Sequence, residues 1–229
     1  MVYAMSDLHG CYEKFAKMLK KINFKDSDTL YILGDIVDRG DGGIKILQDI
    51  MTRPNVIVIQ GNHDFSARRL LKMLCMPENE AEYEKAREHY AFWSIDGGQP
   101  TYRSFVALSF EEQKKILSYM NSFLIYDEII VNNNTFFMSH TVPEKNRMLN
   151  FENLLWQEFI AGEPEYDKQY FDNKYIITGH TPTAFIDPDC KGKIYKKNNH
   201  IAIDCGAVFG NPLGCIRLDT LEEFYVEGN

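Results

Sequence analysis

The sequence predicts an α/β fold in which strands of a parallel sheet alternate with helices. Three short apolar runs, at residues 2–6, 29–33 and 56–60, are typical of strands buried on both faces. Apolar residues three and four positions apart indicate a helix after each of the first two runs: Phe15, Met18, Leu19 and Ile22, then Ile44, Leu47 and Met51. The order strand–helix–strand implies parallel pairing through right-handed crossovers.

The rest of the chain divides into a helical block and a second set of strands. Residues 65–124 are rich in helix formers and charge, with a capping box at Ser109–Glu112 and a predicted loop at 96–100. We interpret this block as a helical insertion that covers the edge of the site. Further strands are expected at 125–131, 135–139, 175–178, 193–196, 200–204, 214–219 and 222–226. With no linker-like segment, residues 1–229 are expected to form a single domain.

Composition narrows the function classes. The chain has 229 residues, 45% hydrophobic and 25% charged, which is typical of a globular protein. A formal net charge of −8 argues against a nucleic-acid coat protein or a membrane-surface protein, since both need basic surfaces. We expect no membrane segment and a cytoplasmic location, because the sequence has neither a long apolar stretch nor a basic leader. Its five cysteines form no Cys-x-x-Cys pattern, and we expect them to be reduced.

Polar clusters follow each of the first three predicted strands, at Ser6–Gly10, Gly34–Gly40 and Gly61–Asp64. Because the carboxyl ends of parallel strands meet at one edge of a sheet, these clusters are expected to form one site. His140 and His180 also come directly after apolar runs. Any one of these motifs alone fits an ordinary turn or a buried histidine, so the prediction depends on all five occurring together.

The side chains of these clusters suggest a metal centre. Carboxylate, amide and imidazole ligands favour manganese, with iron or zinc as alternatives, and the candidate ligands are Asp7, His9, Asp35, Asn62, His140 and His180. Asp35 has two oxygens and could bridge two divalent ions. His63 remains as a candidate general acid, with Asp38 to orient it and Arg39 to bind phosphate oxygens.

Taken in order, these motifs resemble the calcineurin-type metallophosphoesterases and, within them, the phosphoprotein phosphatase branch. The matching segments are Asp-x-His-Gly, Gly-Asp-x-x-Asp-Arg-Gly, Gly-Asn-His-Asp, a histidine after a strand, and Gly-His-Thr-Pro. The resemblance implies a four-layer α/β/β/α sandwich. It also implies that Asp7, His9 and Asp35 bind one metal ion, and that Asp35, Asn62, His140 and His180 bind a second.

Two positions depart from that pattern. Asp64 stands where the branch usually has glutamate, and we expect little effect. Close relatives carry a phosphate-binding arginine two residues after a Leu-Trp pair, but here Leu155-Trp156 is followed by Gln157 and Glu158. The candidates to replace that arginine are Arg147, Arg103 and Arg68.

The predicted function is hydrolysis of phosphoesters by a two-metal centre. Phosphoserine or phosphothreonine in a protein is the first-choice substrate. Diadenosine tetraphosphate, another nucleotide or a phosphodiester is the alternative within this class. A metal-binding scaffold without catalysis is the alternative from another class, and the complete set of candidate residues argues against it.

Overall fold

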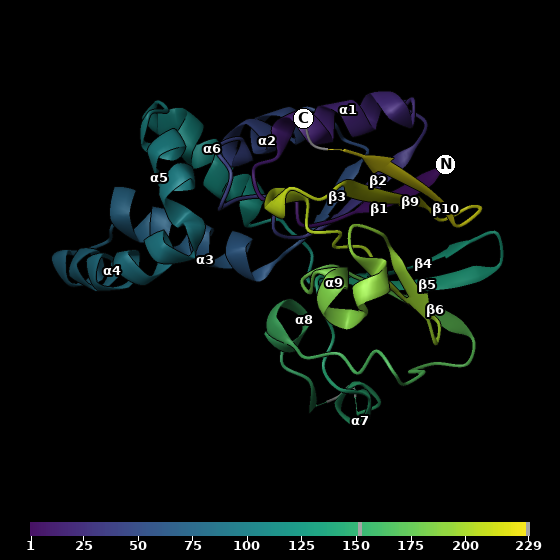
Figure 1. Ribbon diagram of the computed structural model, residues 1–229. Helices are drawn as coiled ribbons and strands as arrows, with labels where there is room; N and C mark the ends of the chain where they lie inside the picture. The colour runs from purple at the N-terminus through teal and green to yellow at the C-terminus, as the bar shows by residue number, and fades with distance from the viewer. Residues whose placement is uncertain (151–152, 228–229) are drawn as a thin grey trace.

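Two five-stranded sheets form the centre of the protein in the computed structural model, which describes residues 1–150 and 153–227 (Figure 1). The first sheet has the order β10-β9-β1-β2-β3. Its strands are β1 (Val2–Met5), β2 (Thr29–Leu33), β3 (Val56–Ile59), β9 (Leu213–Arg217) and β10 (Glu222–Val226). The second sheet has the order β4-β5-β6-β8-β7. Its strands are β4 (Tyr126–Val131), β5 (Asn134–Ser139), β6 (Lys174–Thr178), β7 (Tyr195–Lys197) and β8 (His200–Ala202).

Six helices of eight residues or more accompany the sheets among the described residues. They are α1 (Tyr12–Lys21), α2 (Gly43–Ile50), α3 (Asn62–Cys75), α4 (Glu80–Trp93), α5 (Gln99–Val106) and α6 (Phe110–Met120). Shorter helical segments are α7 (Lys145–Met148), α8 (Glu158–Ala161), α9 (Thr183–Ile186), the π-helical turn η1 (Ser94–Gly98) and the 3-10 turns η3 (Pro188–Cys190) and η4 (Ala207–Phe209). None of the helices in the described ranges has the length and apolar character needed to cross a bilayer.

Both faces of the first sheet are buried, as its continuous apolar strands predict. β1 pairs in parallel with β2, and β2 with β3, which confirms the predicted parallel pairing. Along β2, Leu30 and Ile32 contact the helical layer, while Tyr31 and Leu33 face the second sheet, since successive side chains of a strand point to opposite faces.

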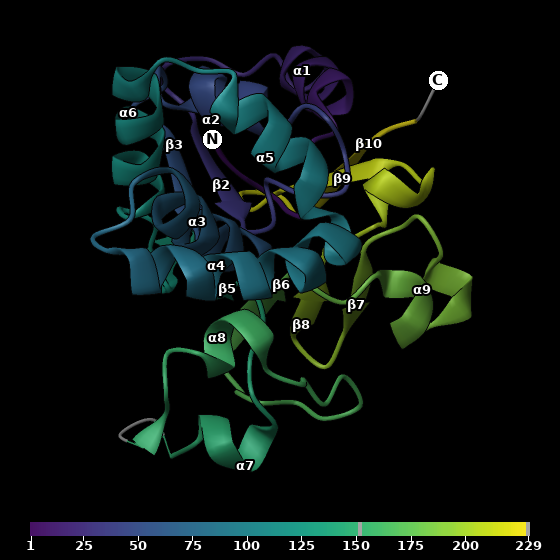
Figure 2. The ribbon, with the colours of Figure 1, turned by 90° about the vertical axis from the view of Figure 1, so that its left-hand side faces the viewer.

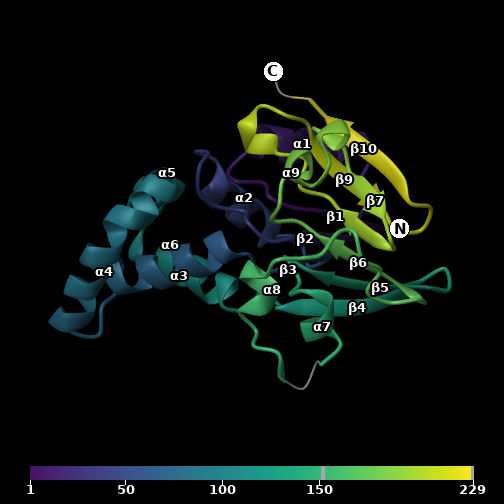
Figure 3. The same ribbon diagram turned by 60° about the horizontal axis from the view of Figure 1, so that its bottom comes forward.

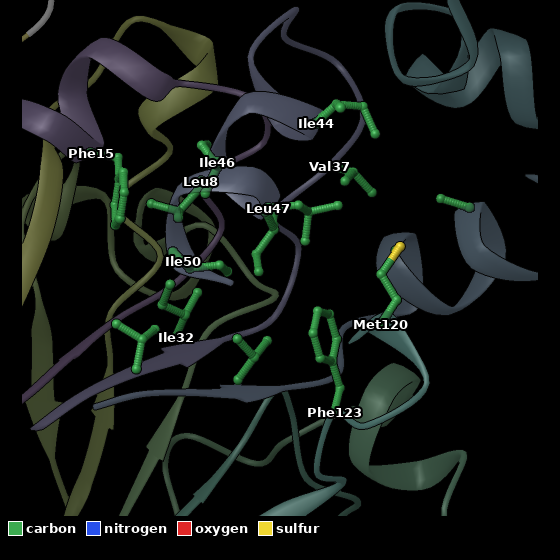
Figure 4. Close-up of a cluster of buried hydrophobic side chains, with 14 of the residues drawn as sticks. Leu8, Phe15, Ile32, Val37, Ile44, Ile46, Leu47, Ile50, Met120 and Phe123 are labelled. Atoms are coloured by element: carbon green, nitrogen blue, oxygen red, sulfur yellow. The ribbon is translucent and has the colours of Figure 1, made fainter. Parts of the chain in front are cut away.

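Three apolar clusters hold four layers together. One joins α1, α2 and α3 to the first sheet; Figure 4 shows Phe15 of α1, Ile46 and Ile50 of α2, and Ile32 of β2 within it. The second fills the space between the two sheets. The third packs α7 and α8 on the side of the second sheet away from the first (Figures 1 and 3). The predicted α/β/β/α sandwich is therefore confirmed.

The predicted helical block is present as α3 to α6, and α3 and α4 run side by side (Figure 2). The capping box is confirmed, because the Ser109 side chain accepts from the backbone N–H of Glu112 and the Glu112 carboxylate accepts from that of Ser109. The predicted loop at 96–100 is instead divided between η1, where Gly97 has φ 104°, and the start of α5. Glycine adopts this left-handed conformation without steric cost, so the helical path is kinked at Gly97.

Candidate active site

An unusual backbone conformation brings the predicted residues to one place. Six of the nine lie in the left-handed region, where residues with a Cβ are uncommon: Asp7, His9, Asp35, Asp38, Arg39 and His180, with φ between 38° and 69°. In each case the chain turns sharply soon after a strand ends, at β1, β2 or β6. Clustered strain of this kind is typical of functional sites and costs about 1–3 kcal/mol per residue.

The first group of polar atoms contains Asp35, Asn62, His140 and His180. The Asn62 Oδ1 atom lies 3.1 Å from both His140 Nε2 and His180 Nδ1, and His140 Nε2 lies 3.5 Å from Asp35 Oδ2. His140 Nδ1 is 2.7 Å from the Leu33 carbonyl oxygen and donates to it, which leaves Nε2 as an acceptor in the neutral ring. When the His140 ring is neutral, several electron pairs converge at this place, and this donor set fits a divalent cation.

The second group contains Asp35, His9 and His63. His9 Nε2 lies 3.5 Å from Asp35 Oδ2, and its Nδ1 donates to the Val37 carbonyl oxygen at 2.9 Å, so Nε2 points into the site as an acceptor. Asp35 is common to both groups, as expected of a bridging carboxylate. The two groups differ from the sequence assignment in one respect, because His63 and not Asp7 stands with His9 and Asp35.

Asp7 lies at the margin of both groups. Its carboxylate accepts the backbone N–H of His180 at 3.0 Å and thereby joins the end of β1 to the end of β6. Gly179 makes this approach possible, since a Cβ at that position would overlap the Asp7 carboxylate. A metal-binding role for Asp7 remains a prediction.

The helical insertion contacts the candidate acid pair. His63 Nδ1 donates to Asp38 Oδ2 at 2.9 Å, and Asp38 is fully buried. The indole N–H of Trp93 donates to the same oxygen at 2.8 Å, and the Thr101 hydroxyl donates to the other at 2.8 Å. The sequence did not identify Trp93 and Thr101; the Gly97-Gly98 pair is the signal that could have drawn attention to them, because a Cβ at residue 98 would overlap the Trp93 ring.

Arg39 reaches both histidines of the second group. Its guanidinium lies within hydrogen-bonding distance of His9 Nε2, and its Nη2 atom lies 3.0 Å from His63 Nε2. Its backbone N–H donates to the Gly97 carbonyl oxygen at 2.7 Å, so the insertion also fixes this residue. The Phe209 ring covers the guanidinium, with its centroid 5.4 Å from Cζ.

Burial and charge shift the pKa values of the ligand candidates in opposite directions. Burial lowers the pKa of His9 and that of His180 to about 4, and raises that of Asp7 to about 6. Burial also disfavours the charged form of His140, but the Asp35 carboxylate outweighs it and raises the His140 pKa to about 10. The same pair holds the Asp35 pKa below its usual value in spite of burial. This electrostatic environment favours a cation beside Asp35.

Asp64, the departure from the family pattern, ties the ends of two strands together. Its buried carboxylate accepts the backbone N–H groups of Ile36 at 3.0 Å and Gly61 at 3.2 Å. It thus holds the loop after β2 against the first turn of α3. Burial raises the pKa of this carboxyl group to about 7.

The three arginines suggested as a second phosphate clamp all have other partners. Arg147 forms a two-pronged pair with Glu158, one of the residues that stand in place of the usual arginine. Arg103 donates to Gln99 and Arg68 to Asn121. None of the three contacts the nine predicted residues in the described parts of the chain, so a second clamp from among them remains a prediction.

Curated relatives resemble one segment of the chain. A symmetrical bis(5'-nucleosyl)-tetraphosphatase of Buchnera aphidicola subsp. Schizaphis graminum is 42% identical over 67 residues, which are 28% of this chain and 24% of that protein. The protein of the same name from Wigglesworthia glossinidia brevipalpis is 39% identical over 66 residues, again 28% of this chain and 24% of the relative. The match thus spans about a quarter of the length of these relatives.

Solved structures match the fold over nearly the whole chain. A candidate diadenosine tetraphosphatase has a TM-score of 0.69 and 17% identity, and covers 100% of this chain and 93% of its own. A serine/threonine phosphatase of Saccharomyces cerevisiae has a TM-score of 0.59 and 13% identity, with 100% and 80% covered. At such identities these structures show the fold alone.

The family assignment rests on a match to most of the chain. The family model described as calcineurin-like phosphoesterase matches residues 1–206, which contain all nine predicted site residues and both sheets except for β9 and β10. The motifs, the two-sheet sandwich and this match agree. The chain belongs to the calcineurin-like phosphoesterase family.

Proposed function

We propose that this protein is a two-metal phosphohydrolase that cleaves a dinucleoside tetraphosphate into two nucleoside diphosphates. The observation that carries the reaction type is the shared carboxylate: Asp35 belongs to both groups of convergent donors, and the His63–Asp38 pair lies beside it. Divalent ions held by these groups would supply Lewis-acid polarisation of a phosphoryl group. The names of the relatives support the nucleotide substrate.

The protein's own residues would supply proton transfer and substrate positioning. Asp38 accepts from His63 Nδ1 and so keeps Nε2 directed into the site as the atom that gives a proton to the leaving oxygen. Burial opposes charge on this ring, yet the hydrogen bond to Asp38 raises the His63 pKa, which favours the protonated donor. The Arg39 guanidinium would bind the equatorial phosphoryl oxygens with two N–H groups.

Phosphoserine or phosphothreonine protein, the first choice from sequence, has weaker support than the nucleotide. The similar serine/threonine phosphatase shares the fold at 13% identity, which says nothing about substrate. The relatives that match by sequence are named as nucleotide hydrolases. The preference between the two substrates is therefore reversed.

A competition assay tests the proposal. The protein is loaded with Mn²⁺ and offered diadenosine tetraphosphate and a phosphothreonine peptide together, with products read by mass spectrometry. We expect two ADP per dinucleotide and an intact peptide, and a turnover lowered by orders of magnitude in Asp35→Asn, which changes the carboxylate common to both donor groups. A dephosphorylated peptide beside intact dinucleotide would overturn the substrate assignment, and stoichiometric metal binding without turnover of either would favour the scaffold.

A further inference from the structure

A cavity of about 310 Å³ lies between α3 and α4, outside the groups of metal-ligand candidates. Its walls come from both helices, with Phe65 on α3 and Phe92 and Trp93 on α4. Figure 2 shows the two helices side by side. The helical insertion therefore does more than cover the sheet, because it forms a hollow with aromatic walls.

The cavity begins directly beside the candidate proton donor. Trp93, which forms one wall, donates its indole N–H to Asp38. Asp96, at another wall, places its Oδ2 atom 3.7 Å from His63 Nε2. Nε2 is the atom that would face the leaving oxygen, and its nearness to Asp96 would put the leaving group on the cavity side of His63.

The residues that line the cavity are of the types that bind an aromatic ring with an attached anionic group. Phe92 is 76% exposed and Phe65 is half-buried, so both rings can be covered by a ligand. Aromatic faces of this kind bind bases by stacking, whichever base is present. Arg69 is exposed on the same wall and has no ion-pair partner within residues 1–150 and 153–227, which leaves its guanidinium available to phosphate.

We propose that this cavity binds the nucleobase of the departing nucleotide, with Phe92 as a stacking surface and Arg69 bound to the phosphates between the base and the cleaved bond. The inference rests on the proposed function, because it assigns a place to the leaving half of that substrate. The volume lies within the range of small-molecule sites, and the polar groups of Ser66 and Asp96 at the walls can bond to a base or ribose.

Adenosine binding to the metal-free protein tests the cavity without any catalysis. The measurement uses a Trp156→Phe background, in which Trp93 at the cavity wall is the sole tryptophan reporter. We expect adenosine to quench its fluorescence saturably. Phe92→Ala should weaken the apparent affinity about tenfold, since stacking on one aromatic ring is worth about 1–3 kcal/mol per base. Phe185→Ala, another exposed phenylalanine at 82%, lies outside the cavity and serves as the matched control.

Kinetics supply the second measurement. With Mn²⁺ present, Phe92→Ala should raise the KM for diadenosine tetraphosphate about tenfold while inorganic tripolyphosphate, which has no base, is affected no more than by Phe185→Ala. Absence of saturable adenosine binding, or an unchanged KM for the dinucleotide in Phe92→Ala, would overturn the inference. Adenosine binding that Phe92→Ala weakens, together with no hydrolysis of the dinucleotide, would instead support the base site and refute the proposed function.

Discussion

Replacing Trp93 by phenylalanine tests whether the helical insertion positions His63, the proposed proton donor. The substitution keeps an aromatic ring at a residue that is 5% exposed and removes the N–H that donates to Asp38 Oδ2 at 2.8 Å. A hydrogen bond to a charged group is worth about 1.5–3 kcal/mol, so we expect the free energy of unfolding to fall by about 2 kcal/mol. If about 1.4 kcal/mol of that free energy serves to position the His63–Asp38 pair in the transition state, the activation barrier should rise by the same amount and the turnover should fall about tenfold.

The assay compares two phosphomonoesters that differ in their leaving groups. An alkyl phosphate needs a proton on its departing oxygen, whereas 4-nitrophenyl phosphate needs that proton much less. We therefore expect the tenfold loss with the alkyl ester and a much smaller loss with the nitrophenyl ester. Trp156→Phe is the matched control, since Trp156 is 39% exposed and packs on Phe65 with ring centroids 4.9 Å apart. Equal losses for both esters, or none, would refute the positioning role and leave Trp93 a structural residue.

The remaining predictions concern packing, pH and metal. Gly98→Ala should displace the Trp93 ring, lower the melting temperature and reduce turnover as the tryptophan variant does; a normal melting temperature would contradict the overlap. Burial lowers the His200 pKa from 6.5 to about 3, so the unfolded chain binds the extra proton below pH 6.5 and stability is lost as the pH falls toward 3. The His200 share of this loss is about 1.4 kcal/mol at pH 5.5. Denaturant titrations at pH 7.5 and 5.5 should therefore show a fall in the free energy of unfolding that is about 1.4 kcal/mol smaller in His200→Gln than in the wild type, and equal falls would contradict the assignment. Saturating Mn²⁺ should raise the melting temperature of the chelator-treated protein, and at 100 times Kd the free energy of unfolding should rise by about 2.7 kcal/mol. Asp35→Asn should abolish most of this increase, and equal shifts in both proteins would contradict a shared ligand.

Much of the fold and of the site could be predicted because both depend on short-range patterns. Strand β2 was predicted at its observed residues, since a five-residue apolar run between polar turns has few other structures open to it. The placement of His9 and Asp35 in one group followed from the rule that the carboxyl ends of parallel strands meet at one edge of a sheet, since they follow the neighbouring strands β1 and β2.

The contacts made by the helical insertion could not be predicted in this way. Trp93 lies 55 residues from Asp38 in sequence, and Thr101 lies 63 residues away, so their hydrogen bonds depend on how four helices fold back over the sheet. The periodic pattern of apolar residues within each helix does not indicate how the four helices are arranged relative to the sheet. The sequence could not set the order of preference between substrates for a related reason, because motifs that hold metal and phosphate are common to enzymes with different leaving groups.

The left-handed backbone of the site matters to anyone who evolves this protein toward heat resistance. Arg39 has φ 68°, a conformation that glycine adopts freely and that costs a residue with a Cβ roughly 1–2 kcal/mol. Selection for heat resistance alone would thus reward Arg39→Gly, which removes the strain together with the proposed phosphate-binding group. A useful screen would couple the heat challenge to turnover, because a survivor of heat alone can be a better-folded protein and a dead enzyme.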